Sequence, residues 1–336
     1  MYKKFFDFTE KPFNTTPDSK FFFPSPKHTE ALNSLIYAIN ERRGFVIITG
    51  EIGAGKTTVC RTLLNKLDVN TRVATITNSH LTCKELIAQI LEEFEVDYKP
   101  GTKQKLLAQL NGHLIKQLAS DINVVLIIDE AQNLNSKVLE EVRMLSNLET
   151  EKEKLIQIIL LGQPQLKAKL QNIRLEQFKQ RIAVYYHLCA LNRDETDQYI
   201  FHRLKLVNPN SFNIFTPRAL DLIFKYSGGI PRIINLICDS ALLSSYVYDT
   251  RKITEKIIEE VVKERDFNRS AAEYEERIPG QEERLAPKIY CCADCAKYLA
   301  CEIKQDKASK GEEQLCCAHC QDFNRCVENT NKIKVN

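Results

Sequence analysis

The sequence predicts an α/β protein, in which a parallel sheet carries helices on both faces and an all-helical region follows. Three observations indicate this. Short apolar runs alternate with segments of helical spacing between residues 44 and 191, which is typical of buried parallel strands. Strand-like runs stop after residue 192, while helical spacing continues to residue 266. Eight of the twelve cysteines fall after residue 290, which marks a separate tail.

Taken in order, the chain begins with an arm rich in phenylalanine and proline. Prolines 12, 17, 24 and 26 preclude a long helix, and we expect the aromatic side chains to pack onto the main body. A first helix is predicted over 27–42. The predicted strands are 44–49, 72–77, 123–129, 155–161 and 183–188. The helices predicted among and after them are 82–94, 102–120, 136–148, 193–206, 217–227, 231–248 and 254–266.

These elements divide the chain into five parts. They are an aromatic arm with the first helix (1–43), the α/β domain (44–191), a helical domain (192–268), a charged linker (269–289) and the cysteine-rich tail (290–336).

The composition is that of an ordinary globular protein. Hydrophobic residues make up 43% and charged residues 27%, and the net charge of +3 does not by itself indicate a nucleic-acid binder. No stretch approaches the ~20 apolar residues of a membrane span, and the N-terminus lacks a signal-peptide core. We therefore expect a cytoplasmic protein without a membrane span of its own and without disulfides.

A glycine-rich loop follows the first predicted strand and leads into a helix. Its residues are Gly50, Glu51, Ile52, Gly53, Ala54, Gly55, Lys56, Thr57 and Thr58. Small glycines let backbone N–H groups turn inward around phosphates at a helix N-terminus. Lys56 would reach the β- and γ-phosphates, and the Thr57 hydroxyl would help to hold Mg²⁺. The alternative is a plain turn, but the full spacing after an apolar strand favours binding of ATP.

Two acidic residues end the apolar strand 123–129. Asp129 would orient Mg²⁺ through a water, and Glu130 would polarise the attacking water as general base. The alternative is a pair of exposed acids at a strand end. With the glycine loop upstream, the pair predicts ATP hydrolysis.

Three further residues are candidates for contact with the phosphates. Gln163 ends a strand and could contact the γ-phosphate, or it could be a turn residue. Arg181 precedes a strand and could act on the ATP of a neighbouring subunit, or form a surface ion pair. Arg232 opens a helix after Gly228-Gly-Ile-Pro and could reach back to the phosphates, or be a surface arginine.

Several blocks of sequence occur in the order found in a known family. They are Pro12-Phe-Asn-Thr-Thr-Pro-Asp, Phe22-Phe-Pro-Ser-Pro-Lys-His28, the glycine loop, Asp129-Glu-Ala-Gln-Asn-Leu, Ser146-Asn-Leu-Glu-Thr, Leu161-Gly-Gln-Pro, Gln180-Arg-Ile and Ser227-Gly-Gly-Ile-Pro-Arg-Ile-Ile-Asn. Over residues 1–266 the chain resembles the ExeA/GspA secretion-pathway ATPases, which are AAA+ proteins broadly related to the ATPases that assist DNA transposition.

The resemblance implies an AAA+ core followed by a helical lid. It further implies that Gln163 is sensor-1, that Arg181 is a finger acting in trans and that Arg232 is sensor-2. The His28 segment would lie near the nucleotide base. The best-known family members continue into a membrane span and a periplasmic peptidoglycan-binding domain, and we expect neither here.

The tail contains an internal repeat. Cys291, Cys292, Cys295 and Cys301 recur 25 residues later as Cys316, Cys317, Cys320 and Cys326. The pairs Cys292/Cys295 and Cys317/Cys320 have a spacing close to that of a Cys₄ zinc site, and the other thiols could form a second site or ligate an iron–sulfur cluster. The alternative is a disordered, thiol-rich tail. The remaining cysteines, Cys60, Cys83, Cys189 and Cys238, are expected to be small core residues.

Two functions from different classes remain open. The first is an ATPase that self-associates in an ATP-dependent way and energises or regulates a secretion or pilus-type assembly system. The alternative is a DNA-associated ATPase of the transposition-helper type, with the tail as a docking module. A nucleotide-sensing scaffold without turnover is disfavoured by Glu130.

Overall fold

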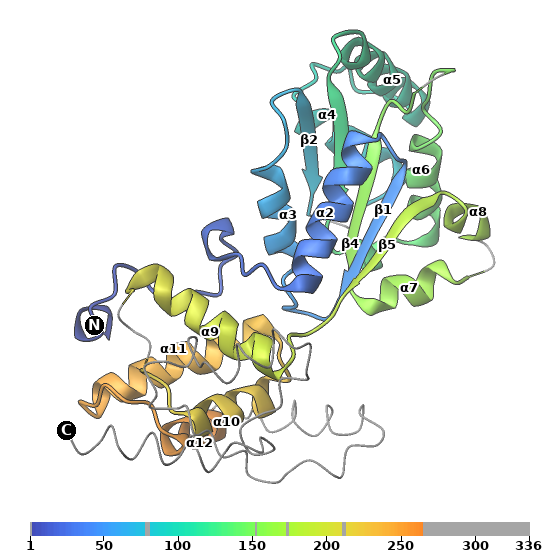
Figure 1. Ribbon diagram of the computed structural model, residues 1–336. Helices are drawn as coiled ribbons and strands as arrows, with labels where there is room; N and C mark the ends of the chain where they lie inside the picture. The colour runs from blue at the N-terminus through green and yellow to red at the C-terminus, as the bar shows by residue number, and fades with distance from the viewer. Residues whose placement is uncertain (1, 78–80, 152, 173–174, 210–212, 265–336) are drawn as a thin grey trace, which may run out of the picture. The chain divides into compact units, whose positions relative to one another are not determined.

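A parallel five-stranded sheet forms the centre of the α/β part of the chain (Figure 1). The computed structural model describes residues 2–77, 81–151, 153–172, 175–209 and 213–264. The strands are β1 (Phe45–Gly50), β2 (Thr71–Ile76), β3 (Asn123–Ile128), β4 (Gln157–Gly162) and β5 (Ile182–Leu188), in the spatial order β2-β3-β4-β1-β5. Every neighbouring pair is parallel, so the predicted parallel sheet is confirmed.

Apolar side chains cover the central strands on both faces. Every residue of β1 and of β4 is buried. Alternate residues of a strand point to opposite faces, so Phe45 and Ile47 belong to one core cluster, and Val46 and Ile48 to another. This two-sided burial explains why the strands read as continuous apolar runs in the sequence.

Two groups of helices cover the two faces (Figure 1). One face carries α2 (Pro26–Asn40) and α3 (Lys56–Leu64). The other carries α4 (Cys83–Glu93), α5 (Lys103–Ala119), α6 (Ser136–Leu145), α7 (Pro164–Leu170) and α8 (Glu176–Lys179). The last two were not predicted, because helices this short have too few residues to display a helical period.

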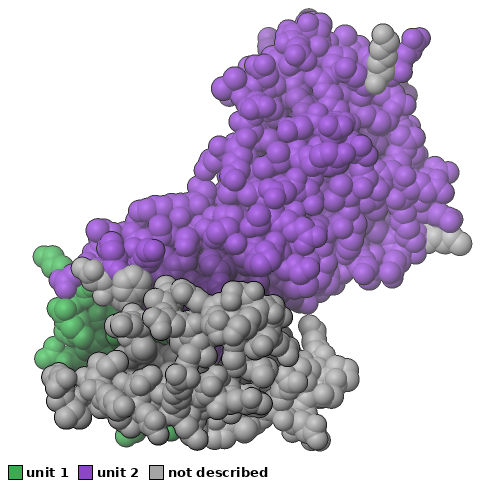
Figure 2. Space-filling model, viewed as in Figure 1, with its two compact units in different colours: residues 1–6, 213–226, 240–336 green, residues 7–212, 227–239 purple. Residues whose placement is uncertain are grey.

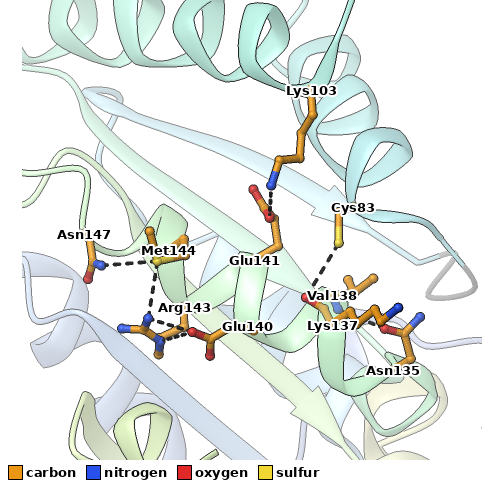
Figure 3. A network of polar contacts seen from close by, with 10 residues as sticks. All are labelled: Cys83, Lys103, Asn135, Lys137, Val138, Glu140, Glu141, Arg143, Met144 and Asn147. Atoms are coloured by element: carbon orange, nitrogen blue, oxygen red, sulfur yellow. Dashed lines mark hydrogen bonds and ion pairs between the residues drawn. The ribbon is translucent and has the colours of Figure 1, made fainter.

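Polar contacts attach α6 to its neighbours (Figure 3). The ammonium of Lys103 on α5 lies 2.7 Å from a carboxylate oxygen of Glu141, and this hydrogen bond raises the pKa of Lys103. The Cys83 thiol on α4 lies 3.6 Å from the Lys137 carbonyl. Within α6, Arg143 donates to the Glu140 carboxylate from Nε and Nη2. The first two contacts join α6 to α5 and to α4.

Beyond the sheet the described chain is helical, as predicted. The helices are α9 (Arg193–Val207), α10 (Pro217–Ser227), α11 (Pro231–Val247) and α12 (Glu255–Glu264). A reciprocal cap starts α9, because the Asn192 side chain accepts from the Glu195 N–H while the Glu195 side chain accepts from the Asn192 N–H. At α10 the Thr216 hydroxyl accepts from the Ala219 N–H at 3.2 Å.

The chain forms two compact units, coloured separately in Figure 2. The larger comprises residues 7–212 and 227–239, so it holds the sheet, α9 and the first part of α11. In the described part of the smaller unit, residues 2–6, 213–226 and 240–264, the Phe5 ring lies 5.6 Å from that of Tyr246, and the Thr216 N–H donates to the Ile253 carbonyl. The five-part domain division stays a prediction.

The aromatic arm contains little regular secondary structure. It contains α1 (Tyr2–Phe5) and the 3₁₀ turn η1 (Ser19–Phe21), and Phe8, Phe13 and Phe21 are buried in the larger unit. The expected packing of the arm is confirmed there. Among the described residues, no helix is both long and apolar enough to cross a membrane.

Candidate functional site

The glycine loop joins β1 to α3, as the sequence predicts. Gly53 and Gly55 have φ values of 83° and 103°, in the left-handed region that disfavours other residues. A Cβ on Gly53 would lie 2.5 Å from Cβ of Arg232, and one on Gly55 would lie 3.0 Å from Nε2 of His28. Glycine is therefore required at both positions for two reasons, backbone conformation and close approach.

Lys56 is the first residue of α3 and is buried. Its ammonium donates to the carbonyl oxygens of Gly50 at 2.8 Å and of Glu51 at 3.0 Å. Burial lowers the pKa of Lys56, and the nearby carboxylates of Glu130 and Asp129 oppose this shift. The ammonium thus lies against the loop, within a field of acidic groups.

Asp129 and Glu130 follow β3 and lie beside the loop. The Thr57 hydroxyl donates to Oδ2 of Asp129 at 3.3 Å, and the Glu130 N–H donates to Oδ1 of Asp129 at 2.8 Å. Burial raises the pKa of Asp129, while the Glu130 N–H and the Thr57 hydroxyl oppose the rise. Glu130 itself has a φ of 50°, a left-handed conformation that is uncommon for a side chain of this kind.

Two glutamines hold the Glu130 carboxylate. Nε2 of Gln163, at the end of β4, lies 3.1 Å from Oε2 of Glu130, and Nε2 of Gln132 donates to the same oxygen. Gln132 also accepts the Gln163 N–H at 3.0 Å. The sequence predicts a role for Gln163 but none for Gln132. Its place in η2 (Ala131–Asn133), directly after Glu130, is the signal that could have found it.

A cavity of about 350 Å³ lies next to the loop, within the larger unit. It is lined by loop residues, by the aromatic arm and by α9 and the start of α11, including Lys56, His28, Phe23, Tyr199, Arg203 and Arg232. His28 is buried, with Nε2 3.0 Å from the Ala54 carbonyl and Nδ1 2.7 Å from the Ser25 hydroxyl. A ring that donates to Ala54 and accepts from Ser25 satisfies both contacts. Burial lowers the pKa of His28, which favours that neutral form.

Arg232 lies beside the glycine loop. Its backbone N–H donates to the Gly53 carbonyl at 3.2 Å, and its side chain lines the cavity. The start of α11 therefore contacts the glycine loop directly.

Arg181 lies elsewhere. It precedes β5, and Ile182 pairs with Phe45 at the opposite end of β1 from the loop. Six residues of strand separate the two ends, which is roughly 20 Å at about 3.3 Å per residue. Arg181 lines a different depression, of about 580 Å³, with Arg143 and Lys154. Of the residues proposed for the phosphate site, the structure thus places Arg181 alone away from the loop.

The expectation of core positions is wrong for one of the four earlier cysteines. Cys60 and Cys238 are buried, and burial raises the pKa of the Cys60 thiol to about 12. Cys83 is partly buried and packs against the core cluster. Cys189 is exposed, because it follows the end of β5, where an apolar neighbourhood in sequence does not ensure burial. The tail cysteines lie outside the described residues, and within the described ranges no group of three or more His, Cys, Asp or Glu could hold a metal ion.

Comparison with known proteins agrees with this geometry. Residues 39–170 match the family described as "AAA domain". Over 257 residues the chain is 44% identical to general secretion pathway protein A of Aeromonas hydrophila. The chain contains an AAA domain and is related to general secretion pathway protein A. The match covers 75% of this chain but 46% of the relative, so the chain spans about half of that protein's length.

Solved structures share the fold at low identity. Cdc6p from Pyrobaculum aerophilum matches with a TM-score of 0.59 and 20% identity, covering 74% of this chain and 71% of that one. The ORC2 protein of Aeropyrum pernix in its ADP form matches with a TM-score of 0.58 and 15% identity, covering 76% and 73%. The ORC1 protein of the same organism, in complex with DNA, matches at 0.56 and 14%, covering 76% and 69%. These likenesses support the P-loop AAA-type fold, as the sequence resemblance implies.

Proposed function

We propose that this chain binds ATP with Mg²⁺ at the glycine loop and hydrolyses it. One observation carries the proposal. The Thr57 hydroxyl, the Asp129 carboxylate and the Glu130 backbone form a single hydrogen-bonded chain beside Lys56, at the edge where β1 and β3 end. These groups come from two separate strand ends, and together they have the chemistry that a nucleotide–metal complex requires.

Two features of the loop support binding of a triphosphate. The positive φ values of Gly53 and Gly55 let the backbone turn tightly around a ligand, and α3 begins directly after the loop without a side-chain cap on its first N–H groups. The Lys56 ammonium, which contacts the Gly50 and Glu51 carbonyls, would exchange these contacts for phosphate oxygens.

The donor set also fits Mg²⁺, which prefers hard oxygen ligands. Thr57 and Asp129 would hold it, the hydroxyl directly and the carboxylate through water. When bound, Mg²⁺ neutralises phosphate charge. Glu130 would accept a proton from the attacking water, while Gln163 and Gln132 keep its carboxylate oriented.

The remaining site residues have roles that the family resemblance suggests. Arg232 would sense the phosphates from α11, which would act with α9 as part of the lid. His28 would lie near the nucleotide base. Because Arg181 is remote from the loop of its own chain, it would act on ATP bound by a second copy, and the chain would self-associate when ATP is present.

Measurements of Mg-ATP binding and of phosphate release test whether the chain is an ATPase. Wild-type chain should bind Mg-ATP and release phosphate, and Lys56→Ala should lose binding. Retained Mg-ATP binding in Lys56→Ala, or no phosphate release by the wild type, would contradict the proposal.

The work done with ATP is the second part of the proposal. We propose a role in energising or regulating a secretion or pilus-type assembly system, because general secretion pathway protein A is 44% identical over three quarters of this chain. The alternative is a DNA-associated ATPase, since the ORC1 protein of similar fold is seen in complex with DNA. Hydrolysis rate and oligomeric state should be measured with and without double-stranded DNA. Stimulation of the hydrolysis rate by DNA, with a steep dependence on salt, would support the alternative and contradict the secretion role.

The cysteine tail is proposed to bind zinc or an iron–sulfur cluster. Support comes from the duplicated spacing in the sequence alone. Elemental analysis and the absorption spectrum of the purified chain test it, and a chain free of both metals would refute the proposal.

A further inference from the structure

The cavity beside the glycine loop has a second end, formed by aromatic side chains and by Arg203 of α9. His28 lies between the two ends. Its Nε2 contacts the loop at Ala54, and its ring lies 6.3 Å from that of Phe22. Beyond it, the Phe23 ring lies 5.8 Å from that of Tyr199. The loop end is therefore polar and cationic, and the far end is aromatic.

Arg203 is buried at this far end, with 4% of its surface exposed. Its guanidinium carbon lies 4.7 Å from the ring centre of Phe21 and 5.5 Å from that of Tyr199. Nη1 donates to the Tyr199 hydroxyl at 3.1 Å and to the Asn14 carbonyl at 3.4 Å. Rings of the arm and of α9 thus hold the guanidinium beside the cavity.

The charge of Arg203 is not matched by an acid. In the part of the chain that the structure describes, no ion pair includes Arg203, and its Nε is buried without a hydrogen-bond partner. An arginine has five N–H donors and no acceptor, so such a group is costly to bury unless an acceptor is supplied. The aromatic faces stabilise the positive charge but accept no conventional hydrogen bond.

The position of the guanidinium is fixed from the loop side. The Tyr199 hydroxyl donates to Oδ1 of Asn235 at 2.9 Å while it accepts from Arg203. Asn235 lies one turn after Arg232 on α11, and the Arg232 N–H contacts the loop carbonyl of Gly53. A continuous series of contacts therefore connects the loop to Arg203, and it sets where the unused donors lie.

We propose that Arg203 donates a hydrogen bond to an acceptor nitrogen of the purine base of the bound nucleotide. The inference rests on the proposed function, in which residues 50–58 hold the phosphates. A nucleotide anchored there extends its base toward the far end of the cavity. Aromatic rings and a guanidinium plane are the groups on which bases stack, and ring nitrogens are acceptors for the N–H donors that Arg203 presents to the cavity.

Two other roles for Arg203 make different predictions. If it contacted phosphate, it would contribute equally to the binding of ATP and of inorganic tripolyphosphate. If it only fastened the arm to α9, its loss would lower stability without changing the relative affinity for these two ligands. The comparison of ATP with tripolyphosphate therefore separates the three roles.

The experiment measures Mg²⁺-dependent binding of ATP and tripolyphosphate to the full chain by calorimetry. Arg203→Gln should weaken ATP binding by about tenfold or more, the loss expected for a hydrogen bond from a charged donor, and change tripolyphosphate binding by less than about twofold. Lys205→Gln, an exposed cation on the same helix, is the matched control and should change neither. Equal weakening of both ligands, or unchanged ATP binding in Arg203→Gln, would overturn the inference.

A second measurement uses only the wild-type chain, so its outcome does not depend on whether a variant folds. Wild-type chain is titrated with the 1-, 3- and 7-deaza analogues of ATP, each of which lacks one ring acceptor. At least one should bind about tenfold more weakly than ATP. If all three bind as ATP does, the base contact is absent and the inference fails. If the wild type binds neither ATP nor tripolyphosphate, the proposed function fails instead.

Discussion

Nε2 of Gln163 lies 3.1 Å from Oε2 of Glu130, although 33 positions separate the two residues in the chain. The contact exists because β3 and β4 are neighbours in the sheet, so that the residues after each strand meet at one edge. The Glu130 carboxylate is thereby held in place by an amide, which cannot itself take up a proton from water. This contact supports the proposal that Glu130 acts as the base and that Gln163 positions it.

We expect Glu130→Gln to bind Mg-ATP with unchanged affinity but to hydrolyse it about 10²- to 10⁴-fold more slowly, the range for loss of a general base. The substitution keeps the shape of the side chain and removes only its basicity. Single-turnover phosphate release measures the effect. A normal hydrolysis rate would refute the role of Glu130.

Removal of the Gln163 amide tests whether this side chain positions the Glu130 carboxylate. Gln163→Ala should lower kcat about tenfold with little change in KM. A lost hydrogen bond to a charged group costs about 1.5–3 kcal/mol, and here the loss should raise the barrier to hydrolysis without weakening ATP binding. If Gln163 acts through the Glu130 carboxylate, adding Gln163→Ala to the Glu130→Gln variant should cause little further loss of hydrolysis. A further tenfold loss in the double variant would show that Gln163 does not act through Glu130.

Gly53→Ala should destabilise the fold by about 1–3 kcal/mol, because the residue has a positive φ and a new Cβ would press on Arg232. Gly112→Ala is the matched control. A Cβ there meets nothing within 4 Å, and the position lies inside α5, so alanine should stabilise by about 0.5–1 kcal/mol. Denaturant unfolding measures both. The explanation fails if the two variants change stability in the same direction.

Arg181→Ala should retain nucleotide binding, because the residue lies at the other end of β1 from the loop. If it acts on a neighbouring copy, hydrolysis should fall about 10³-fold or more. Mixing this variant with Lys56→Ala should then restore part of the activity, since one copy supplies the loop and the other the arginine. The absence of restoration at concentrations where the chains associate would contradict action in trans.

Protonation of His28 should limit stability in acid. Burial lowers its pKa below the ordinary 6.5, so the unfolded chain binds the proton more readily than the folded chain. The contribution of neutral His28 to the free energy of unfolding is therefore fully present above pH 6.5. It is lost as the pH falls from 6.5 through the lowered pKa of His28 in the folded chain. His28→Gln should flatten the dependence of the free energy of unfolding on pH below 6.5. Only part of the slope should disappear, because burial also lowers the pKa of His113 and His202. An unchanged slope would show that His28 does not titrate in this window.

The sequence by itself determines the local parts of this protein. The strand, the glycine loop 50–58 and the helix after it are contiguous, and so are the strand 123–129 and Glu130. Their hydrophobic periodicity, and the glycine and acidic residues at the strand ends, predict both the elements and the phosphate site. The strands found differ from those predicted by only one or two residues at their ends.

Tertiary structure alone decides which distant side chains share that site. Sheet order β2-β3-β4-β1-β5 places Gln163 on Glu130, and parallel pairing with β1 carries Arg181 away from the loop. Packing of the arm on α9 buries Arg203 beside the same cavity. No local pattern encodes these outcomes, because each depends on burying the apolar faces of the whole sheet and its helices at once, and on the few arrangements that allow it.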